Sequence, residues 1–436
     1  MTSYLISGAE LATGGRADVA IRDGHFVDPK DVVGKKGTVA VDASGLVALP
    51  GLVDLHTHLR QPGLEQAETI LSGSQSAALG GFTAVHAMAN TDPVGDTPGI
   101  TDAVARMGRE AGYVTVRPVG AITKSLAGEE LSAMAAMAAG SGAVRVFSDD
   151  GKCVHDSLVM RRALEQAKAL GAVVAQHAQD PRLTIDSQMN EGALSSRLGL
   201  TGWPGVAEES IIARDVLLAE YVGARLHVCH LSTAGSVDVI RWAKKRGIAV
   251  TAEVTPHHLL LTEDLVAGFD PLFKVNPPLR TAEDTIALRE ALAEGIIDIV
   301  ATDHAPHPSE SKECAFGEAA FGMLGLEMAL PVVIETLVKP GLMAWSDVAR
   351  VLSSAPATIG SLAGYDAPLA IGSPAHLTLV DHSAMSPSPR GSLSSNNPYP
   401  DDALPGRVMF TFHYGVATVN GGELVEAHVV SAGGSQ

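Results

Sequence analysis

The chain contains little cysteine and few aromatic residues. Only three cysteines, Cys153, Cys229 and Cys314, occur in 436 residues, and none belongs to a Cys-x-x-Cys pair. This sparse, odd set argues against a disulfide framework and predicts a reducing compartment, the cytoplasm. Aromatic residues make up 4% of the chain, whereas hydrophobic residues make up 46%. We therefore expect a substantial core that rests on alanine, valine, leucine and isoleucine.

Positive charge and long apolar runs are also scarce. The 31 Lys and Arg residues stand against 49 Asp and Glu residues, which gives a formal net charge of −18. Such a chain is a poor partner for nucleic acid or for an anionic membrane surface. No uninterrupted apolar run reaches the roughly 20 residues of a spanning helix, and the first residues lack the pattern of a signal peptide. We expect neither nucleic-acid nor membrane partners.

Short apolar runs rich in β-branched residues are abundant in the central part of the chain. Eight of them follow one another: Leu52–His56, Thr83–Met88, Val114–Val119, Ala143–Phe147, Ala172–Gln176, Arg225–Cys229, Ile248–Val254 and Ile297–Ala301. Segments with helical periodicity separate most of them, such as Leu158–Leu170, Glu208–Val222 and Thr281–Gly295. Repeated alternation of nearly all-apolar strands with helices predicts a parallel (β/α)₈ barrel of the TIM type. An open doubly wound sheet is the main alternative, because periodicity alone does not prove closure.

The two ends of the chain differ from its centre, because their patterns are typical of short strands separated by turns. Residues 1–49 contain four such strands, and residues 365–436 contain three more with a hairpin signal at Asn420–Gly422. The sequence therefore predicts a small β-sandwich domain built from residues 1–49 and 365–436, beside a barrel domain of residues 50–364. The Ser-, Pro- and Asn-rich segment Ser383–Pro400 is expected to be an irregular surface loop.

Residues of the kind that bind metals recur directly after the predicted strands. His56 and His58 lie two residues apart on the first strand, so their side chains point the same way and can reach one ion. Later strands are followed by Asn90, by Asp149 and Asp150, by His177, by His230, and by Asp303, His304 and His307. The carboxyl ends of barrel strands form the active-site face. Four histidines and two carboxylates suit a two-metal hydrolytic centre bridged by a carboxylate and a hydroxide.

Four motifs then give the chain a family resemblance. They are Asp54–Gly63, His227–Thr233, Asn276–Arg280 and Ala301–His307. Together they resemble the motifs of the type I bacterial dihydroorotases of the amidohydrolase superfamily, and the resemblance covers essentially the whole chain. It implies a zinc-dependent cyclic amidohydrolase that reversibly converts N-carbamoyl-L-aspartate to L-dihydroorotate in pyrimidine biosynthesis.

The resemblance also implies roles for individual residues. Two zinc ions would be held by His56, His58, Asp150, His177, His230 and Asp303. Many relatives bridge their metals with a carboxylated lysine; here Asp150 would be the bridge, with Asp149 as the alternative. Asp303 would also serve as the general base and acid. The substrate would be held by Arg60, Asn90, Asn276, His307 and the backbone around Phe321 and Gly322. A guanidinium suits this task because it can bind a carboxylate through two hydrogen bonds.

Two departures from the family pattern remove no ligand. Ala89 stands where the family usually has proline, and Gln176–Asp180 replaces a more usual His-Cys-Glu-Asp run. The other strand histidines are expected to be packing residues or to lie behind the ligands: His86, His227, His257, His258 and His304.

Two alternative functions remain open. A hydantoinase or allantoinase would share the barrel and the metals but have a different ring pocket; Arg60 with Asn90 and Asn276 favours a substrate that bears a carboxylate. A non-catalytic subunit that scaffolds aspartate transcarbamoylase should have lost ligands, and none is missing here. The sequence allows a transcarbamoylase partner and a homo-oligomer but requires neither.

Overall fold

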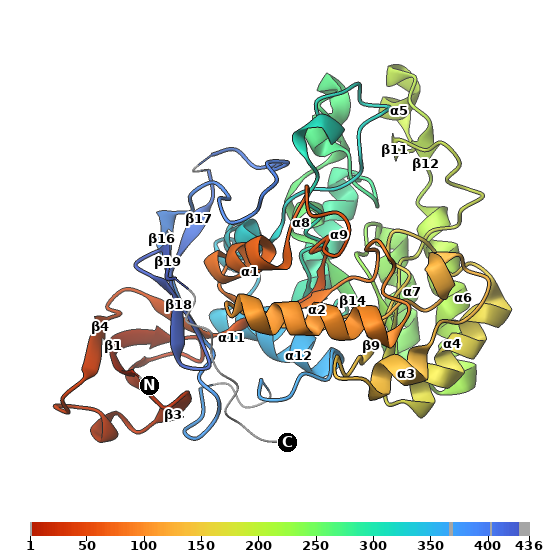
Figure 1. Cartoon of the computed structure of the whole chain (residues 1–436). Coiled ribbons are helices and arrows are strands. Elements are labelled where there is room, and N and C mark those ends of the chain that lie inside the picture. The colour runs from red at the N-terminus through yellow and green to blue at the C-terminus, as the bar shows by residue number, and fades with distance from the viewer. Residues whose placement is uncertain (1, 366–368, 402, 427–436) are drawn as a thin grey trace.

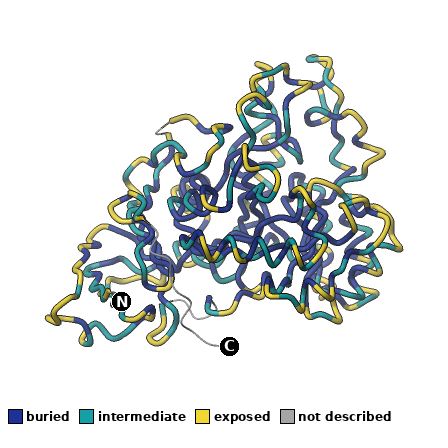
Figure 2. The backbone as a smooth tube through the Cα atoms, viewed as in Figure 1, coloured by how far each residue is buried: buried dark blue, intermediate teal, exposed yellow. Residues whose placement is uncertain are grey.

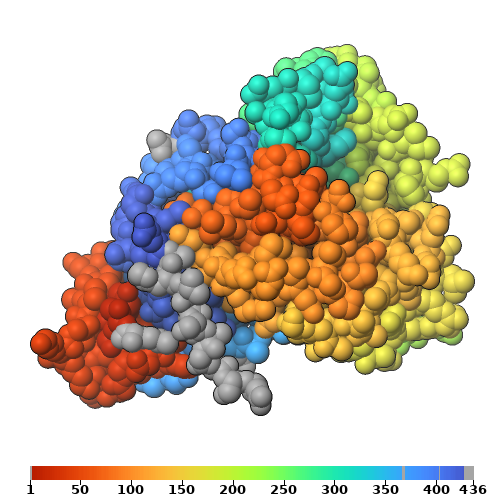
Figure 3. Space-filling model, viewed as in Figure 1, coloured from red at the N-terminus to blue at the C-terminus, as the bar shows by residue number. Residues whose placement is uncertain are grey.

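The computed structural model describes residues 2–365, 369–401 and 403–426. Figure 1 shows that strands from both ends of the chain lie together at one end of the molecule, while the helix-rich centre forms the rest. In Figure 3 the N-terminal residues (red) and the C-terminal strands (blue) lie next to one another on the same surface. The first and last strands of the chain are therefore close in space, although the whole central part lies between them in the sequence.

A single hydrogen-bonded sheet of nine strands joins the two ends, in the order β19-β18-β17-β16-β5-β1-β2-β3 with β4 paired to β1. Its strands are β1 (Ser3–Leu11), β2 (Arg16–Arg22), β3 (His25–Val27), β4 (Thr38–Asp42), β5 (Val47–Pro50), β16 (Leu377–Met385), β17 (Pro405–His413), β18 (Val416–Asn420) and β19 (Glu423–Leu424). The seven predicted strands of the two ends are confirmed. β5 was not predicted, although it is the junction: it pairs with β1 in parallel and with β16 antiparallel. The sandwich interpretation and the domain boundaries stay predictions, and residues 366–368, 402 and 427–436 of that domain lie outside the described residues.

Each of the eight predicted central runs contains a strand. β6 (Leu52–Thr57), β7 (Phe82–Ala87) and β8 (Thr115–Pro118) form one parallel sheet. A second parallel sheet consists of β9 (Val146–Phe147), β10 (Val173–Gln176), β13 (Leu226–Val228), β14 (Val250–Val254) and β15 (Ile299–Val300). Single parallel bridges, Gly120 with Phe147 and Thr57 with His304, connect the two sheets at both of their edges.

Helices follow most of these strands, and some of them begin with a side-chain cap. They are α1 (Ile70–Leu79), α2 (Pro98–Ala111), α3 (Met134–Ala139), α4 (Ser157–Ala169), α5 (Ala193–Leu198), α6 (Val206–Val222), α7 (Ala234–Lys245), α8 (Pro256–Leu260), α9 (Ala282–Ala293), α10 (Ala329–Val333), α11 (Trp345–Ala349) and α12 (Ala355–Ile359). The Asp156 carboxylate accepts hydrogen bonds from the first turn of α4, and Thr281 with Asp284 forms a capping box on α9. The three predicted helices are thereby confirmed as α4, α6 and α9.

The core is aliphatic, as the composition predicts. One cluster fills the space between the central strands and their helices, with members such as Val85, Leu164 and Val216. A second cluster joins residues from β6, β10 and β15, among them Leu55 and Ile299, and it includes Cys229. Cys229 is thus a small buried hydrophobe, as expected. Figure 2 shows this buried interior beneath an exposed outer layer. Among the described helices, none has the length and apolarity that crossing a membrane demands.

Between β10 and α6 the chain makes an excursion, seen at the upper right of Figure 1, that contains α5 and a two-stranded pair, β11 (Met189–Asn190) and β12 (Gly202–Trp203). The fully buried Arg280 fixes it, donating to Asn190 Oδ1 and to the Trp203 carbonyl, both at 2.7 Å. Arg280 is therefore a structural residue, which holds the excursion next to the carboxyl ends of the strands.

Candidate metal and active site

The six predicted metal ligands lie together although they come from distant parts of the chain. Their potential ligand atoms form two groups, within each of which all atoms lie within 4.8 Å of one another. The first group consists of His56, His58, Asp150 and Asp303, and the second of Asp150, His177 and His230. His56 lies next to the last residue of β6, the other five follow the strands β6, β9, β10, β13 and β15, and all six are buried. Asp150 belongs to both groups.

The separations between these atoms fit a metal centre. In the first group, His58 Nε2 lies 3.1 Å from Asp303 Oδ1 and 3.2 Å from Asp150 Oδ2, and His56 Nε2 lies 3.3 Å from Asp150 Oδ1. In the second, Asp150 Oδ1 lies 3.2 Å from His177 Nδ1 and 3.3 Å from His230 Nε2. Ligands bound tetrahedrally to one ion at about 2.0–2.1 Å lie about 3.3 Å apart. The atoms are therefore spaced as the edges of such a coordination shell would be.

A buried atom without a hydrogen bond supports the same interpretation. His56 Nε2 is buried and makes no hydrogen bond in the described part of the chain, although it faces two carboxylates. Burial alone would lower the pKa of His56, but the charges of Asp150, Glu253 and Asp303 raise it well above its usual value. Burial opposes ionisation of Asp150 and Asp303, yet the facing imidazoles hold both pKa values below the ordinary range. A cation between these groups would satisfy both carboxylates at once.

Asp149 and Asp150 point to different surroundings. Asp149 Oδ1 accepts hydrogen bonds from the backbone of Ile122 at 2.7 Å and of Thr123 at 2.9 Å, and its Oδ2 accepts from the Thr123 hydroxyl. Its carboxylate is therefore engaged in fixing the segment after β8. Asp150 alone of the two faces the histidines.

Glu253, within β14, lies directly behind the cluster and was missed by the sequence analysis. Its Oε1 lies 2.6 Å from His56 Nδ1, and its Oε2 lies 3.0 Å from Nε2 of His227. Burial would raise the pKa of Glu253, but the two histidines lower it to about 2, so it is a carboxylate. It holds His56 with Nε2 toward the other ligands. A charged residue inside an apolar strand was the signal that could have found it.

The predicted substrate contacts Arg60 and His307 lie beside the cluster. Arg60 Nε donates to the Pro306 carbonyl at 3.1 Å, and its Nη atoms have no hydrogen-bond partner among the described residues. Burial lowers the pKa of Arg60 to about 10, which leaves it charged at neutral pH. Burial and the nearby Arg60 lower the pKa of His307 to about 3. Neutral His307 donates from Nε2 to the Phe321 carbonyl at 2.8 Å and keeps a lone pair on Nδ1.

The two predicted asparagine contacts are each tied to a histidine of the cluster. Asn90 Oδ1 lies 2.8 Å from Nδ1 of His58 and so orients that ring, which leaves the Asn90 amide group for another acceptor. Asn276 Nδ2 donates to Gln179 Oε1 at 3.1 Å, and Gln179 Oε1 in turn lies 2.8 Å from His177 Nε2. The buried Asn276 Oδ1 has no partner in the described residues.

Backbone strain accompanies the site. Arg60, His230 and Asp303 have φ angles of 60°, 31° and 45°, in the left-handed region that residues with side chains seldom adopt. Gly322, with φ 143°, approaches so closely that a Cβ there would lie 2.8 Å from His307 Nε2. Strain of this kind is characteristic of functional sites held by the surrounding fold.

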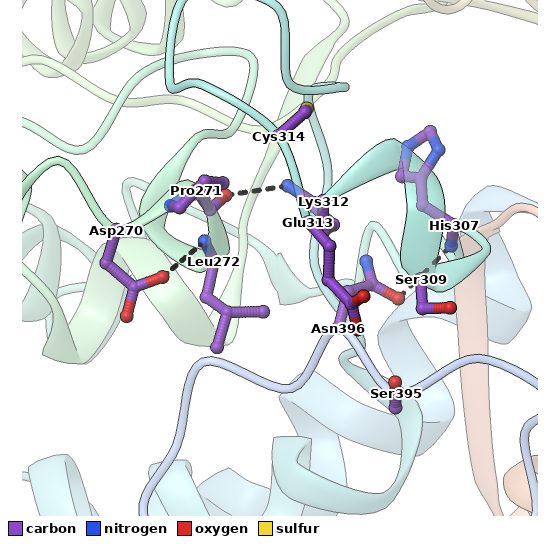
Figure 4. A pocket seen from close by; sticks show the side chains of 10 residues that line it. All are labelled: Asp270, Pro271, Leu272, His307, Ser309, Lys312, Glu313, Cys314, Ser395 and Asn396. Atoms are coloured by element: carbon purple, nitrogen blue, oxygen red, sulfur yellow. Dashed lines mark hydrogen bonds between the residues drawn. The ribbon is translucent and has the colours of Figure 1, made fainter.

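A cavity of about 520 Å³ opens beside His307, and Figure 4 shows its lining. None of the six clustered ligands borders it. Asn396, from the segment predicted to be a surface loop, is 2% exposed and accepts from the His307 backbone at 3.1 Å. It also donates to the carbonyls of Ala305 and Gly322. The prediction of a surface loop is therefore wrong in part: Ser383–Met385 belong to β16, and Asn396 is buried against the site.

Comparisons with known proteins agree with this geometry. A family model described as dihydro-orotase-like matches residues 45–236. Proteins named dihydroorotase are similar over nearly the whole chain: that of Leifsonia xyli is 60% identical over 98% of both chains, and that of Streptomyces coelicolor is 57% identical over 97% of this chain and all of its own. The protein of that name from Mycobacterium tuberculosis is 52% identical over 97% of this chain and 99% of its own.

Solved structures share the fold. An L-hydantoinase (dihydropyrimidinase) from Arthrobacter aurescens superposes with a TM-score of 0.86 at 25% identity, covering 98% of each chain. A dihydropyrimidinase from Brevibacillus agri gives a TM-score of 0.81 at 21% identity, covering 97% of this chain and 96% of its own. Both have the architecture seen here, whereas the much higher identities belong to the dihydroorotases. The chain therefore belongs to the dihydroorotase family.

Proposed function

We propose that this protein is a dihydroorotase, which reversibly cyclises N-carbamoyl-L-aspartate to L-dihydroorotate in de novo pyrimidine biosynthesis. The observation that carries the proposal is the convergence of six buried imidazole and carboxylate groups beside Arg60, a guanidinium whose Nη atoms have no partner in the described residues. The identity of 52–60% to proteins of that name supports the choice of reaction.

The eight central strands would form a closed (β/α)₈ barrel. Closure is supported by the two single bridges that link the parallel sheets at both edges, in the same order as the strands follow along the chain. In such a barrel the ligands stand at the carboxyl ends of the strands, at the catalytic face.

Two zinc ions would be held here, one by His56, His58, Asp150 and Asp303 and the other by Asp150, His177 and His230. Asp150 would be shared by both, because its carboxylate faces His56 and His58 of the first group and also His177 and His230 of the second. When bound, the metals would supply a water of lowered pKa and would polarise the amide carbonyl of the substrate.

Proton transfer would be the task of Asp303, a carboxylate at neutral pH that can take the proton of the attacking water. It would then deliver that proton to the leaving nitrogen during ring opening, and ring closure would reverse these steps. Arg60 would hold the substrate carboxylate, and Asn90 could donate its free amide group to the same anion. Neutral His307, Asn276 and the backbone at Phe321 and Gly322 would face the ring.

The alternative of a hydantoinase is kept because the solved structures of similar fold carry that name. The test compares the metal-loaded chain on dihydroorotate, hydantoin and allantoin, with elemental analysis of the same sample. We expect turnover of dihydroorotate, cyclisation of N-carbamoyl-L-aspartate and about two zinc ions per chain. Turnover of hydantoin alone would overturn the proposal.

The proposed function also includes a cellular location and a candidate partner. We place the protein in the cytoplasm, with aspartate transcarbamoylase as a candidate partner and a homo-oligomer as a candidate assembly. If the isolated chain is silent and gains activity only on mixing with the transcarbamoylase, the enzyme requires its partner. If it binds the transcarbamoylase but never acts, the non-catalytic alternative is correct.

A further inference from the structure

A continuous line of hydrogen bonds leads from the turn after β10 to the candidate metal centre. The Thr184 hydroxyl lies 2.9 Å from the carbonyl oxygen of Asp180, and Thr184 Oγ1 lies 2.8 Å from Nε2 of Gln179. Gln179 Oε1 lies 2.8 Å from His177 Nε2 and 3.1 Å from Asn276 Nδ2. One side chain, Gln179, therefore touches both a proposed metal ligand and a proposed substrate contact.

The carbonyl of Asp180 sets the direction of this line. A carbonyl oxygen can only accept, so Thr184 donates its single proton there. Thr184 Oγ1 then accepts from the amide nitrogen of Gln179. This places the amide oxygen of Gln179 on the opposite side, where it can only accept. His177 Nε2 and Asn276 Nδ2 must therefore both be donors.

The direction of these hydrogen bonds determines which ring nitrogen of His177 carries the proton. A neutral imidazole carries one proton, so donation from Nε2 leaves the lone pair on Nδ1. Nδ1 is the atom that faces the cluster, 3.2 Å from Asp150 Oδ1 and 2.9 Å from His230 Nε2. The ring is thus held in the tautomer that a metal ligand requires.

The same direction fixes the amide of Asn276. Because Nδ2 is engaged by Gln179, Oδ1 is the end left for the substrate, and it is buried without a partner in the described residues. A lone acceptor at this point recognises an N–H group and repels a carboxylate. Within this site, Arg60 would then bind the carboxylate of the substrate.

The reverse arrangement fails on two counts. If the amide of Gln179 were turned over, Thr184 would have to donate to it and the carbonyl of Asp180 would lose its partner. The proton of His177 would also move to Nδ1, where it would be donated to Asp150 Oδ1 and would take up the lone pair that a metal ligand requires. Only the first arrangement keeps the hydrogen bond to the Asp180 carbonyl and leaves the lone pair on Nδ1 of His177 for a metal.

We propose that Gln179 is a positioning residue that sets both the tautomer of His177 and the amide orientation of Asn276, so that Asn276 Oδ1 reads an N–H of the substrate. The substrate half of this inference rests on the proposed function. The half that concerns His177 depends on the chain alone, and the two halves can be tested separately.

The test compares Gln179→Met, which removes the amide, with Gln179→Glu, which keeps an accepting oxygen. Gln188→Met is the matched control, because Gln188 lies in the same excursion and contacts neither His177 nor Asn276. In metal-free chains labelled with ¹⁵N-histidine, at a pH where the ring of His177 carries a single proton, NMR should find that proton on Nε2 in the parent, the control and Gln179→Glu. Gln179→Met should give a mixture of tautomers and, by competition with a chelator, bind zinc about 10-fold more weakly or worse.

Steady-state kinetics tests the substrate half. Gln179→Met should raise KM for dihydroorotate several-fold in the parent background and add nothing in an Asn276→Ala background, because the effect passes through Asn276. A parent-like tautomer and zinc affinity in Gln179→Met would overturn the inference about His177, and an unchanged or independent rise in KM would overturn that about Asn276. If the parent itself does not act on dihydroorotate, the proposed function fails, while the NMR and chelator results still decide the role toward His177.

Discussion

Asp303 carries two of the proposed roles, metal ligand and proton acceptor, and this makes it the most direct residue to test. Its Oδ1 lies 3.1 Å from His58 Nε2, and the histidines keep it ionised despite burial. Replacing it by alanine removes the proposed proton acceptor, whose contribution in such reactions is about 10²–10⁴-fold. We expect Asp303→Ala to lower kcat by about 10³-fold or more while the melting temperature changes little.

The matched control is Asp264→Ala. It removes an exposed carboxylate that is not close in the sequence to any of the six clustered residues. It should keep the parent's kcat and KM. Turnover of Asp303→Ala within a few-fold of this control, with the fold intact, would refute the role in proton transfer.

Glu253 acts on the site through His56. Because its two oxygens accept from His56 and His227, an amide in its place would offer one acceptor and one donor, so one imidazole would face the wrong partner. Groups behind a metal ligand typically alter affinity by about 10–100-fold. We expect Glu253→Gln to weaken zinc binding by that amount in a chelator competition. An unchanged affinity would mean that Glu253 only fills space.

The clustering of the six proposed ligands could be predicted from the sequence, but the residues that hold them in place could not. His56, His177 and Asp303 were predicted to lie together because each ends or follows an apolar run, and parallel strands bring their carboxyl ends together. Glu253 acts through a contact with His56, which is distant in the sequence. Gln179 acts through the donor and acceptor directions of its hydrogen bonds. Glu253 left one local signal, a charge inside an apolar strand, whereas nothing in the local sequence marks Gln179.

At the level of elements, the segment from residue 305 to 322 is held by contacts that strand periodicity does not predict. Its backbone is fixed by Asn396, which comes from the loop after β16 and is buried against it. A Ser- and Pro-rich segment is usually exposed, and no local pattern indicates that this one packs against the site. β5 was missed for a related reason: it ends at Pro50 and runs directly into Gly51 and β6, so the two strands read as one apolar stretch.

The close approach within this segment gives an element-scale prediction. A Cβ on Gly322 would lie 2.8 Å from both Ala305 Cβ and His307 Nε2, at a φ of 143°. Gly322→Ala should therefore displace His307 and raise KM about 10-fold or more, since small displacements of contact groups are costly. Gly317→Ala is the control in the same segment, because nothing lies within 4 Å of its Cβ position. Equal KM values in the two variants would contradict the placement of His307 at the substrate.

At the scale of the whole molecule, the order of the central strands followed from their alternation with helices, whereas the single sheet at the ends did not follow from the strand pattern. Its nine strands pair across the full length of the chain, and the pairing of β5 with β16 joins residues more than 300 positions apart. Local sequence carries the strand but not its partner. The contact of this sheet with the centre is likewise a property of the folded chain only.

That contact contains two buried histidines whose neutrality links stability to pH. His376 precedes β16 and stacks on Tyr365 with ring centroids 4.2 Å apart, and neither of its ring nitrogens has a hydrogen-bond partner among the described residues. His413 ends β17, and its Nε2 lies 2.9 Å from the hydroxyl of Thr115. Burial lowers the pKa of His413 to about 4, and burial with the neighbouring His413 lowers that of His376 well below its usual value.

The sign of the effect follows from these directions. In the unfolded chain both histidines take up protons near pH 6.5, whereas in the folded chain they stay neutral until lower pH. The unfolded state therefore binds more protons as the pH falls below about 6.5, and the free energy of unfolding declines. Between pH 7.5 and pH 5 each histidine should cost about 2 kcal/mol of stability.

His376→Phe keeps a stacked ring on Tyr365 and removes the titrating group. Measured by urea denaturation in the presence of a chelator, so that metal loss does not contribute, this variant should lose about 2 kcal/mol less than the parent between pH 7.5 and pH 5. His382→Phe, at an exposed position, is the control and should follow the parent curve. If the curves of His376→Phe and the parent run parallel across this range, protonation of His376 does not weaken the contact between the end sheet and the centre.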